Sequence, residues 1–200
     1  MNESKLLILK TAFRLFLQKS FREVTLKEIV QETGLSKGAF YHYFESKEKL
    51  FTEVVETFYF EKMLVDYDQL SKNSLRDFYQ DYVKYIEKLL NEVAEFFSNS
   101  DSDVNINYLH IMMDALRLFP GFRDKVTLLK KRELKAWTEI TSQARAKGEF
   151  SSPMTDEQIA RIFLYSNDGI GFDLLFENRL GEASNEMLTM WDNFYKELAE

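Results

Sequence analysis

The sequence predicts an all-α protein with a small amino-terminal helix-turn-helix domain and a larger helical body. Apolar residues recur at helical spacing almost throughout the 200 residues, and no segment alternates with the period of a β-strand. Only two prolines and seven glycines interrupt this pattern. Two short helical segments near the amino terminus are separated by a glycine turn, as in a helix-turn-helix. We expect about nine helices, divided between a domain at residues 1–55 and a domain at residues 56–200.

The segment around Thr25 carries the signals of a helix start. The Thr25 hydroxyl can cap the helix while Glu28, three residues later, bonds back to the cap. Val24 and Ile29 occupy the positions of a hydrophobic staple. Gly34 supplies the permissive backbone that ends this helix. A preceding helix is expected over residues 2–18, and its apolar face consists of Leu7, Ile8, Ala12, Leu15 and Phe16.

Serine residues mark two more helix starts. Ser36 is placed to cap a third helix through Tyr43, and Ser46 to cap a fourth helix that runs toward residue 66. The polar segment 98–103 and the Phe-Pro-Gly segment 119–121 are expected to be a loop and a turn. The remaining helices are expected at about 74–97, 103–118, 121–147, 155–178 and 183–198.

Composition predicts a soluble, cytoplasmic protein without a metal or another cofactor. The chain has no cysteine, which excludes disulfides and thiolate metal sites and suits a reducing compartment. Its amino terminus has no signal-like apolar run, and no segment approaches about 18 uninterrupted apolar residues. We therefore expect no membrane association.

Charge is distributed unevenly along the chain. The net charge of −7 would disfavour nucleic-acid binding if it were spread evenly. Residues 1–50, however, hold nine Lys and Arg against six Asp and Glu, a balance of +3, and the rest of the chain carries −10. A weakly basic amino-terminal domain is compatible with a protein that contacts phosphate through one end only, although an excess of this size also arises by chance.

The segment 25–44 is suited to a helix-turn-helix that binds DNA, in which the second helix enters the major groove and the first braces it. The residues left to face DNA are Lys37, Gly38, Tyr41, His42 and Tyr43, with Lys47 at the start of the fourth helix. Lysine and tyrosine can bond phosphate oxygens, and histidine can contact base edges. The core between the helices is expected to consist of Leu26, Ile29, Val30, Leu35, Phe40 and Phe44.

This part of the chain closely resembles the DNA-binding head of the TetR family of transcriptional regulators. The residues that carry the resemblance are Thr25, Ile29, Gly-Leu-Ser-Lys-Gly at 34–38, Tyr-His-Tyr-Phe at 41–44 and Ser-Lys-Glu-Lys-Leu at 46–50. The resemblance covers residues 5–55 and implies a three-helix DNA-binding domain followed by a helical domain that binds a ligand and dimerises, usually through its last two helices. It also implies that the positions facing DNA are Thr25, Lys27, Lys37, Gly38, Tyr41, Tyr43 and Lys47.

The chain departs from the common family pattern at two positions. Ala39 stands where many members have a threonine that can bond phosphate, and Ser20 stands where a glycine often ends the first helix. Both departures concern contact details and leave the resemblance intact.

The body contains residues that could line a pocket for an apolar or aromatic effector. The aromatic and thioether candidates are Tyr82, Met113, Trp137 and Tyr165, and the polar candidates for orienting a ligand are His110, Asn167 and Asp168. The alternative for each of them is a place in a helical core or on a solvated surface.

The last two predicted helices could form a dimer interface. Gly169 and Gly171 interrupt an apolar helix, and each costs roughly 1 kcal/mol relative to alanine, which suggests the close approach of another element. Met187, Trp191 and Phe194 form an apolar stripe on the last helix. We expect Gly171 and this stripe to contact a second subunit in a four-helix interface, although the stripe could also pack inside its own subunit.

These features predict a homodimeric, ligand-responsive transcriptional regulator, more specifically a repressor that a small effector releases from a pseudo-palindromic operator in double-stranded DNA. An enzyme is not expected, because two histidines, no cysteine and no Gly-rich phosphate loop leave little for catalysis. One alternative is a DNA-associated structural factor whose body binds a protein partner. Another is a helical enzyme or carrier with a vestigial head. Activation in place of repression is also open, because it depends on the promoter.

Overall fold

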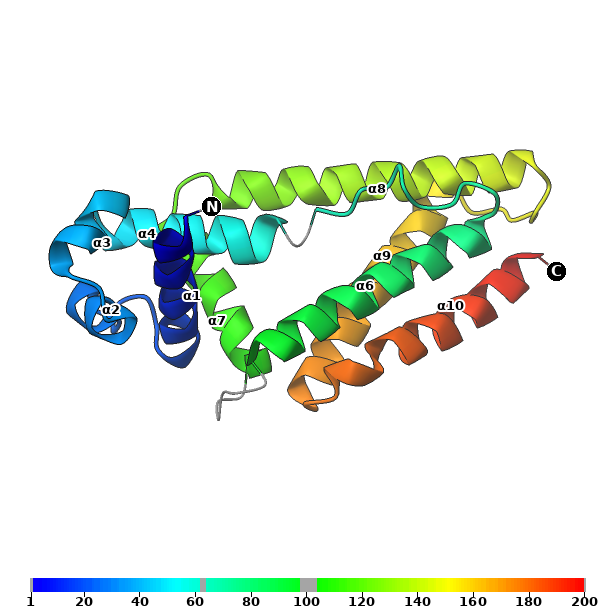
Figure 1. The fold of residues 1–200 in the computed structure, drawn as a ribbon. Helices are drawn as coiled ribbons and strands as arrows, with labels where there is room; N and C mark the ends of the chain where they lie inside the picture. Colours follow the sequence, from blue (N-terminus) through cyan, green and yellow to red (C-terminus); the bar gives the residue numbers. More distant parts are fainter. Residues whose placement is uncertain (1, 62–63, 98–103, 200) are drawn as a thin grey trace. The chain divides into compact units, whose positions relative to one another are not determined.

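The computed structural model describes residues 2–61, 64–97 and 104–199, and all regular secondary structure in these ranges is helical. The predicted all-α fold is therefore confirmed for this part of the chain (Figure 1). A π-helix, η1 (Glu56–Phe60), continues α4, and a 3-10 helix, η2 (Leu180–Glu182), leads into α10. The α-helices are α1 (Glu3–Gln18), α2 (Leu26–Thr33), α3 (Lys37–Tyr43), α4 (Lys47–Val55), α6 (Leu75–Phe97), α7 (Val104–Leu118), α8 (Phe122–Ala146), α9 (Asp156–Phe176) and α10 (Ala183–Ala199).

The helix bounds agree with the predicted ranges to within two residues, except at the end of the fourth helix. The predicted loop at 98–103 lies outside the described residues. None of the helices in the described ranges combines the length and the apolar character that crossing a membrane requires.

The fourth helix is shorter than predicted. Its α-helical part ends at Val55, η1 ends at Phe60, and residues 64–66 are not helical, whereas the prediction ran toward residue 66. Asp66 explains the difference at its end, because its side chain accepts a hydrogen bond from the backbone N–H of Asp68 (3.1 Å) and its carbonyl accepts one from Gln69 (3.1 Å). Such local side-chain bonds offer the backbone a turn that competes with a helix.

Local signals mark the starts of α2, α3 and α9 and the end of α2 as the sequence predicts. The hydroxyl oxygens of Thr25 and Ser36 accept hydrogen bonds from the N–H groups of Glu28 (3.2 Å) and Ala39 (3.1 Å), which caps α2 and α3. Gly34 ends α2 with φ +66°, a left-handed conformation that glycine adopts without strain. A complete capping box joins Thr155 and Gln158 at the start of α9.

The described chain forms two compact units. The first contains α1 to α4, η1, α7 and the start of α8, and the second contains α6, the rest of α8, α9, η2 and α10. This division differs from the predicted domains at residues 1–55 and 56–200, because α7 packs against α1 and α4. The predicted boundary near residue 55 stays a prediction about functional domains.

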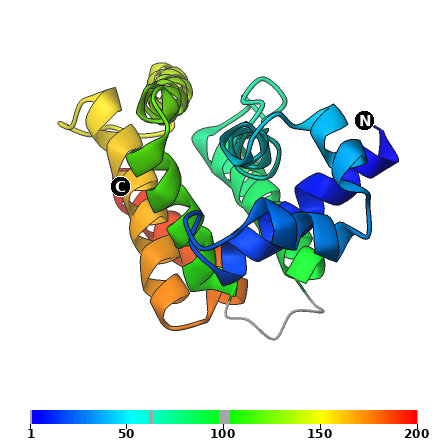
Figure 2. The ribbon, with the colours of Figure 1, turned by 90° about the vertical axis from the view of Figure 1, so that its left-hand side faces the viewer.

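Aromatic packing holds the first unit together. Phe51 of α4 lies edge-on to Phe16 of α1, with ring centroids 4.9 Å apart, and stacks on Phe119 at 4.8 Å. Phe13 stacks on Phe58 of η1 at 4.6 Å. Figure 2 shows α1, α2 and α3 of this unit, with α2 crossing next to α1. These rings join α1, α4, η1 and the residue that follows α7.

A second aromatic core lies in the other unit. Trp137 of α8 and Trp191 of α10 are 0 % and 1 % exposed, and their rings are 5.4 Å apart. Tyr79, Tyr82 and Phe163 complete the cluster, each within 6.0 Å of Trp191. Offset and edge-on aromatic contacts of this kind add to the free energy gained by burying the rings.

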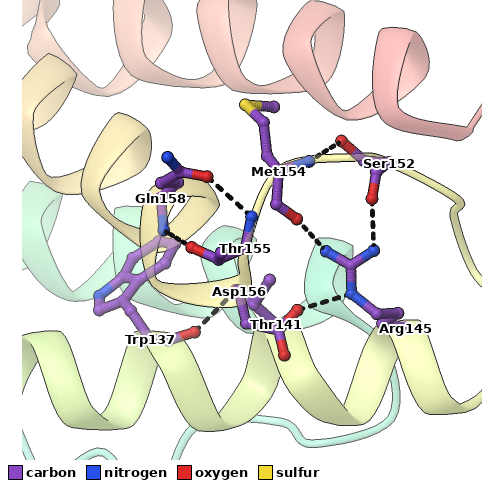
Figure 3. Close-up of polar contacts among 8 residues, drawn as sticks. All are labelled: Trp137, Thr141, Arg145, Ser152, Met154, Thr155, Asp156 and Gln158. Carbon is purple, nitrogen blue, oxygen red and sulfur yellow. Dashed lines mark hydrogen bonds and ion pairs between the residues drawn. The ribbon is translucent and has the colours of Figure 1, made fainter.

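Arg145 organises the connection between α8 and α9 (Figure 3). Its guanidinium group donates to the carboxylate of Asp156 (2.7 Å) and to the backbone carbonyls of Ser152 (2.8 Å) and Met154 (2.6 Å), and lies 5.1 Å from the centre of the Phe150 ring. The planar, forked guanidinium can satisfy several acceptors at once. One side chain thus bonds two residues of this connection and Asp156, the first residue of α9.

Candidate nucleic-acid interface

Two buried rings determine which side of α3 faces outward. Phe40 is 0 % exposed and Phe44 is 2 % exposed, so both rings lie in the core of the first unit. In an α-helix, residues two positions from Phe40 point about 200° away from it. Gly38 and His42 therefore lie on the side opposite the core, and both are exposed.

The predicted DNA-facing residues gather at the start of α2 and along α3. Thr25, Lys27, Lys37, Gly38, Tyr41 and His42 are exposed, and Tyr41 keeps 45 % of its surface accessible. Tyr43 is half-buried, and its ring lies edge-on to His42 at 4.9 Å. The structure thus leaves six of the predicted residues exposed at the start of α2 and along α3, with Tyr43 partly covered.

Lys27 and Lys37 are available to bind phosphate. Within the described parts of the chain, neither forms an ion pair, whereas Arg14, Lys19 and Lys5 are paired with Glu32, Glu28 and Glu53. The ammonium of Lys37 lies 5.8 Å from the centre of the Tyr41 ring, which orients it along α3. Unpaired cations on an exposed helical surface can replace the counterions of a nucleic-acid backbone.

Packing among the described residues does not require a glycine at position 38. A Cβ added there would meet the Ser36 Oγ atom at 4.0 Å, which is an ordinary contact. Its φ also lies outside the left-handed region. A side chain at this position would therefore fit the protein, and the open surface at Gly38 leaves room for a partner to approach the backbone of α3.

Lys47 is engaged inside the protein, and the prediction that it also holds a flanking phosphate stays a prediction. Its ammonium donates to the carbonyl oxygens of Phe21 (2.7 Å) and Val24 (2.8 Å) and lies 4.3 Å from the centre of the Phe21 ring. An ammonium has three donors, so these bonds leave one proton for another acceptor. The main visible role of Lys47 is to hold the connection between α1 and α2, which the sequence could not indicate because the two carbonyls lie more than twenty residues away.

The structure also accounts for Ser20, which stands where the family often has a glycine. The Ser20 N–H and hydroxyl both donate to the carboxylate of Glu23, at 2.9 and 2.7 Å. The hydrogen bonds from Ser20 lower the pKa of this carboxyl group. A side-chain turn therefore takes the place of the glycine that often follows the first helix.

The structure separates the predicted ligand-binding residues. Tyr82 and Trp137 are buried in the core of the second unit, and Tyr82 donates a hydrogen bond to Glu133 (3.0 Å). His110 and Met113 belong to α7 of the first unit, where both are exposed. Only Tyr165 and Asp168 line the same surface cleft, and Asn167 is half-buried beside them on α9.

That cleft lies between α8 and α9 and has a volume of 470 Å³. The Lys130 ammonium contacts Asp168 at 2.9 and 3.1 Å and Glu133 at 3.1 Å, while Leu134 and Leu164 supply apolar surface. Burial, followed by the Glu133 charge, raises the pKa of Tyr82 beneath this cluster. Sequence analysis missed Lys130 and Glu133, because their i, i+3 spacing lies within an ordinary charged run of α8.

The predicted dimer residues lie mostly inside one subunit. Met187 and Trp191 are each 1 % exposed, and Phe194 packs against the same core. For these residues the structure corresponds to the alternative, packing within the protomer. The last helix thus turns its apolar stripe inward, because α6, α9 and α10 share that core.

A different apolar surface is exposed on α9. A Cβ added at Gly169 or at the half-buried Gly171 would meet no atom within 4 Å, so neither glycine is required by packing within the described protomer. Gly169 lies between the exposed residues along one helical stripe. The large members of this stripe are Ile162 (39 % exposed), Tyr165 (61 %), Phe172 (46 %) and Phe176 (69 %).

Comparisons with known proteins point to one family. Residues 8–54 match the bacterial regulatory proteins of the tetR family. The HTH-type transcriptional regulator YerO of Bacillus subtilis is 52 % identical over 56 residues, or 28 % of this chain, and the chain spans only 19 % of YerO. The regulator YfiR of Bacillus subtilis is 28 % identical over 82 % of this chain and 76 % of its own length.

A solved structure extends the similarity to the fold of the whole chain. The reduced form of NemR from Escherichia coli, an HTH-type transcriptional repressor, aligns with 96 % of this chain and 97 % of its own, with a TM-score of 0.62 and 20 % identity. At this level of identity the alignment shows a shared fold. The family match lies in the amino-terminal region that contains α2 and α3.

Replacing the unpaired Lys37 and replacing Lys47, which bonds two backbone carbonyls, should change DNA binding in different ways. We expect Lys37→Ala to weaken binding to a mixed-sequence DNA duplex and to reduce the slope of log K against log salt by about 1, because it removes one phosphate contact. We expect Lys47→Ala to weaken binding with an unchanged slope, and to lower the free energy of unfolding by about 1–3 kcal/mol, because two backbone carbonyls lose a charged donor.

Fluorescence anisotropy over a salt series and urea unfolding measure these effects. Lys135→Ala, which removes an exposed cation of α8, is the matched control and should change neither quantity appreciably. A Lys37→Ala variant with the wild-type slope, or a Lys47→Ala variant that loses as much slope as Lys37→Ala, would contradict the assignment.

Proposed function

Because the chain belongs to the TetR family of transcriptional regulators, we propose that it acts as a homodimeric, ligand-responsive repressor of a pseudo-palindromic operator. The observation that carries the proposal is the outer surface of α2 and α3. There Lys27 and Lys37 are unpaired among the described residues, and Tyr41 and His42 are exposed on a helix held by buried rings. Repression is favoured over activation because the relative NemR is a repressor.

The geometry of α3 supports insertion into a major groove. The helix is seven residues long and exposes Gly38 and His42 opposite its buried Phe40. Lys27 and the capped start of α2 are placed to bond phosphates beside the groove. His42 and Tyr41 are the candidates for contacts to base edges, since both side chains carry hydrogen-bonding groups on the exposed side.

The stripe on α9 supports a dimer. Four large apolar side chains are exposed along one helical face with a glycine between them, which allows two helices to approach closely. A twofold axis would bring the same stripe of a second copy against this one, so that each subunit buries the other's rings. We propose this face in place of the buried residues Met187 and Trp191.

The cleft between α8 and α9 supports a response to a small molecule. Leu134, Leu164 and the Tyr165 ring offer apolar contacts, and Lys130 and Asp168 offer a charged pair at the same opening. A molecule with both an apolar body and a polar group fits this combination, which makes the apolar or aromatic effector expected from the sequence more specific. Tyr165 also belongs to the α9 stripe, so occupancy of the cleft and packing of the dimer would involve the same side chain.

The central test is selection of bound sequences from a random DNA pool by the purified protein. We expect the selected sites to be inverted repeats with half-sites about one helical turn apart, because two identical heads would each occupy a major groove. Single half-sites without symmetry would argue against a dimeric operator complex. Failure to enrich any sequence, together with a flat salt dependence, would exclude the DNA-binding proposal.

Dimerisation can be tested at the α9 stripe. We expect Phe172→Glu to give a folded monomer in analytical ultracentrifugation and to weaken operator binding, since a charge would be buried against the second subunit. Leu128→Glu, at a position that is 60 % exposed on α8, is the matched control and should remain dimeric. A dimeric Phe172→Glu variant would place the interface elsewhere.

Effector binding can be tested by thermal melting against a panel of small amphipathic compounds. A compound at concentration c that binds only the folded state stabilises it by RT ln(1 + c/Kd), so the melting temperature rises with the concentration of the compound. We expect such a shift in the wild type and a much smaller one in Asp168→Asn, because this change weakens the pair that Asp168 forms with Lys130 in the cleft. An undiminished shift in the variant would assign the compound to another site.

A further inference from the structure

The backbone of Phe21, in the connection between α1 and α2, is held from two sides. Its carbonyl oxygen accepts the hydrogen bond from Lys47 of α4 already described. Its N–H donates to the Oδ2 atom of Asp114 on α7 at 2.8 Å. The two partners lie far away in the sequence, at 26 and 93 residues from Phe21, so the position of this peptide depends on two other helices of the first unit.

The Phe21 ring is held as firmly as its backbone. It is 8 % exposed and lies edge-on to Phe51 of α4 at 4.9 Å and to Phe119, just after α7, at 5.5 Å. Phe119 in turn stacks on Phe51 at 4.8 Å. The end of α7 therefore packs around the same residue that Asp114 bonds.

Asp114 lies on a helix that is packed against two helices of the same unit. Ile111 and Ala115, on the adjacent face of α7, are 2 % and 0 % exposed, and α7 packs against α1 and α4. The Asp114 side chain is half-buried, and its bond to the Phe21 N–H is charge-assisted, so it is stronger than a bond between neutral groups. A rigid carrier and a strong acceptor make this contact suited to setting the position of a loop.

The connection ends at the first predicted DNA contact. Only Arg22, Glu23 and Val24 separate Phe21 from Thr25, the residue that caps α2, and Val24 is fully buried. A shift of Phe21 would be passed to the start of α2, and with it to Thr25 and Lys27. We infer that Asp114 is a positioning residue for DNA binding, which holds the start of α2 in place by accepting the Phe21 N–H.

This role lies outside the matched region at residues 8–54, on a helix that the sequence assigns to the body. It also gives α7 a direct influence on the head. A displacement of α7 that broke the bond from Phe21 to Asp114 would free the α1–α2 connection while leaving the capped helices themselves intact. The inference rests on the proposed function, because it concerns how the head is presented to DNA.

Two variants distinguish the loss of the acceptor oxygen of Asp114 from the loss of its negative charge. Asp114→Ala and Asp114→Asn both remove the negative charge, but only the alanine variant removes the oxygen that accepts the Phe21 N–H. We expect Asp114→Ala to raise the Kd for the selected operator about tenfold with an unchanged salt slope, as the loss of one charge-assisted hydrogen bond to a positioning loop predicts. We expect Asp114→Asn to stay within about twofold of the wild type.

A second measurement reports on the contact without DNA. Exchange of the Phe21 amide hydrogen with solvent should accelerate in Asp114→Ala and stay slow in Asp114→Asn, because only the asparagine oxygen can replace the acceptor. Affinities are to be compared at a temperature where circular dichroism shows each variant fully folded, so that a loss of stability alone does not change the result.

Three outcomes would overturn the inference. Asp114→Ala with the wild-type Kd would show that the bond does not position the head. Asp114→Asn as weak as Asp114→Ala would assign the effect to charge and not to the acceptor. Wild-type protein that binds no duplex DNA at all would overturn the proposed function and the positioning role together, whereas the first two outcomes leave the proposed function intact.

Discussion

The aromatic packing of the first unit is the constraint on which the rest of this protein depends. Phe16, Phe51 and Phe119 come from three different segments and meet around Phe21, while Phe40 is buried in the same unit. Burial of Phe40 and Phe44 in this unit fixes the rotation of α3 about its own axis, and this rotation decides that Gly38 and His42 face outward. The outer side of α3 is thus the exposed side of a core, which determines the direction in which its side chains point.

Charged side chains in this unit serve two distinct purposes. Lys47 and Asp114 form hydrogen bonds to the backbone of the α1–α2 connection. There they pair N–H and carbonyl groups that lie outside the helices and so have no partner within a helix. Lys27 and Lys37 have no ion-pair partner among the described residues and so remain available to a polyanion. A net charge of only +3 in residues 1–50 is therefore compatible with binding a polyanion, because binding depends on which cations remain unpaired and not on their total.

The second unit has a buried apolar core and a separate apolar surface that is exposed. Trp137 and Trp191 fill the interior, and the stripe from Ile162 to Phe176 on α9 stays exposed. A soluble protein rarely leaves a contiguous apolar stripe of this length uncovered, which is why a second copy is the proposed occupant. The adjoining cleft contains both Lys130 and Leu134, so the body offers a charged and an apolar contact at one opening.

The sequence by itself determined the all-α fold, the helix bounds except the end of the fourth helix, the caps at Thr25 and Ser36, the turn at Gly34 and the outward positions of α3. These features depend on local interactions, within one or two helical turns, that leave a direct pattern in the chain. Only the tertiary structure decided the partners of Lys47, the contact between Asp114 and Phe21, and the inward direction of Met187 and Trp191. Helical periodicity shows that a helix has an apolar face, but which element covers that face depends on residues far away in the chain.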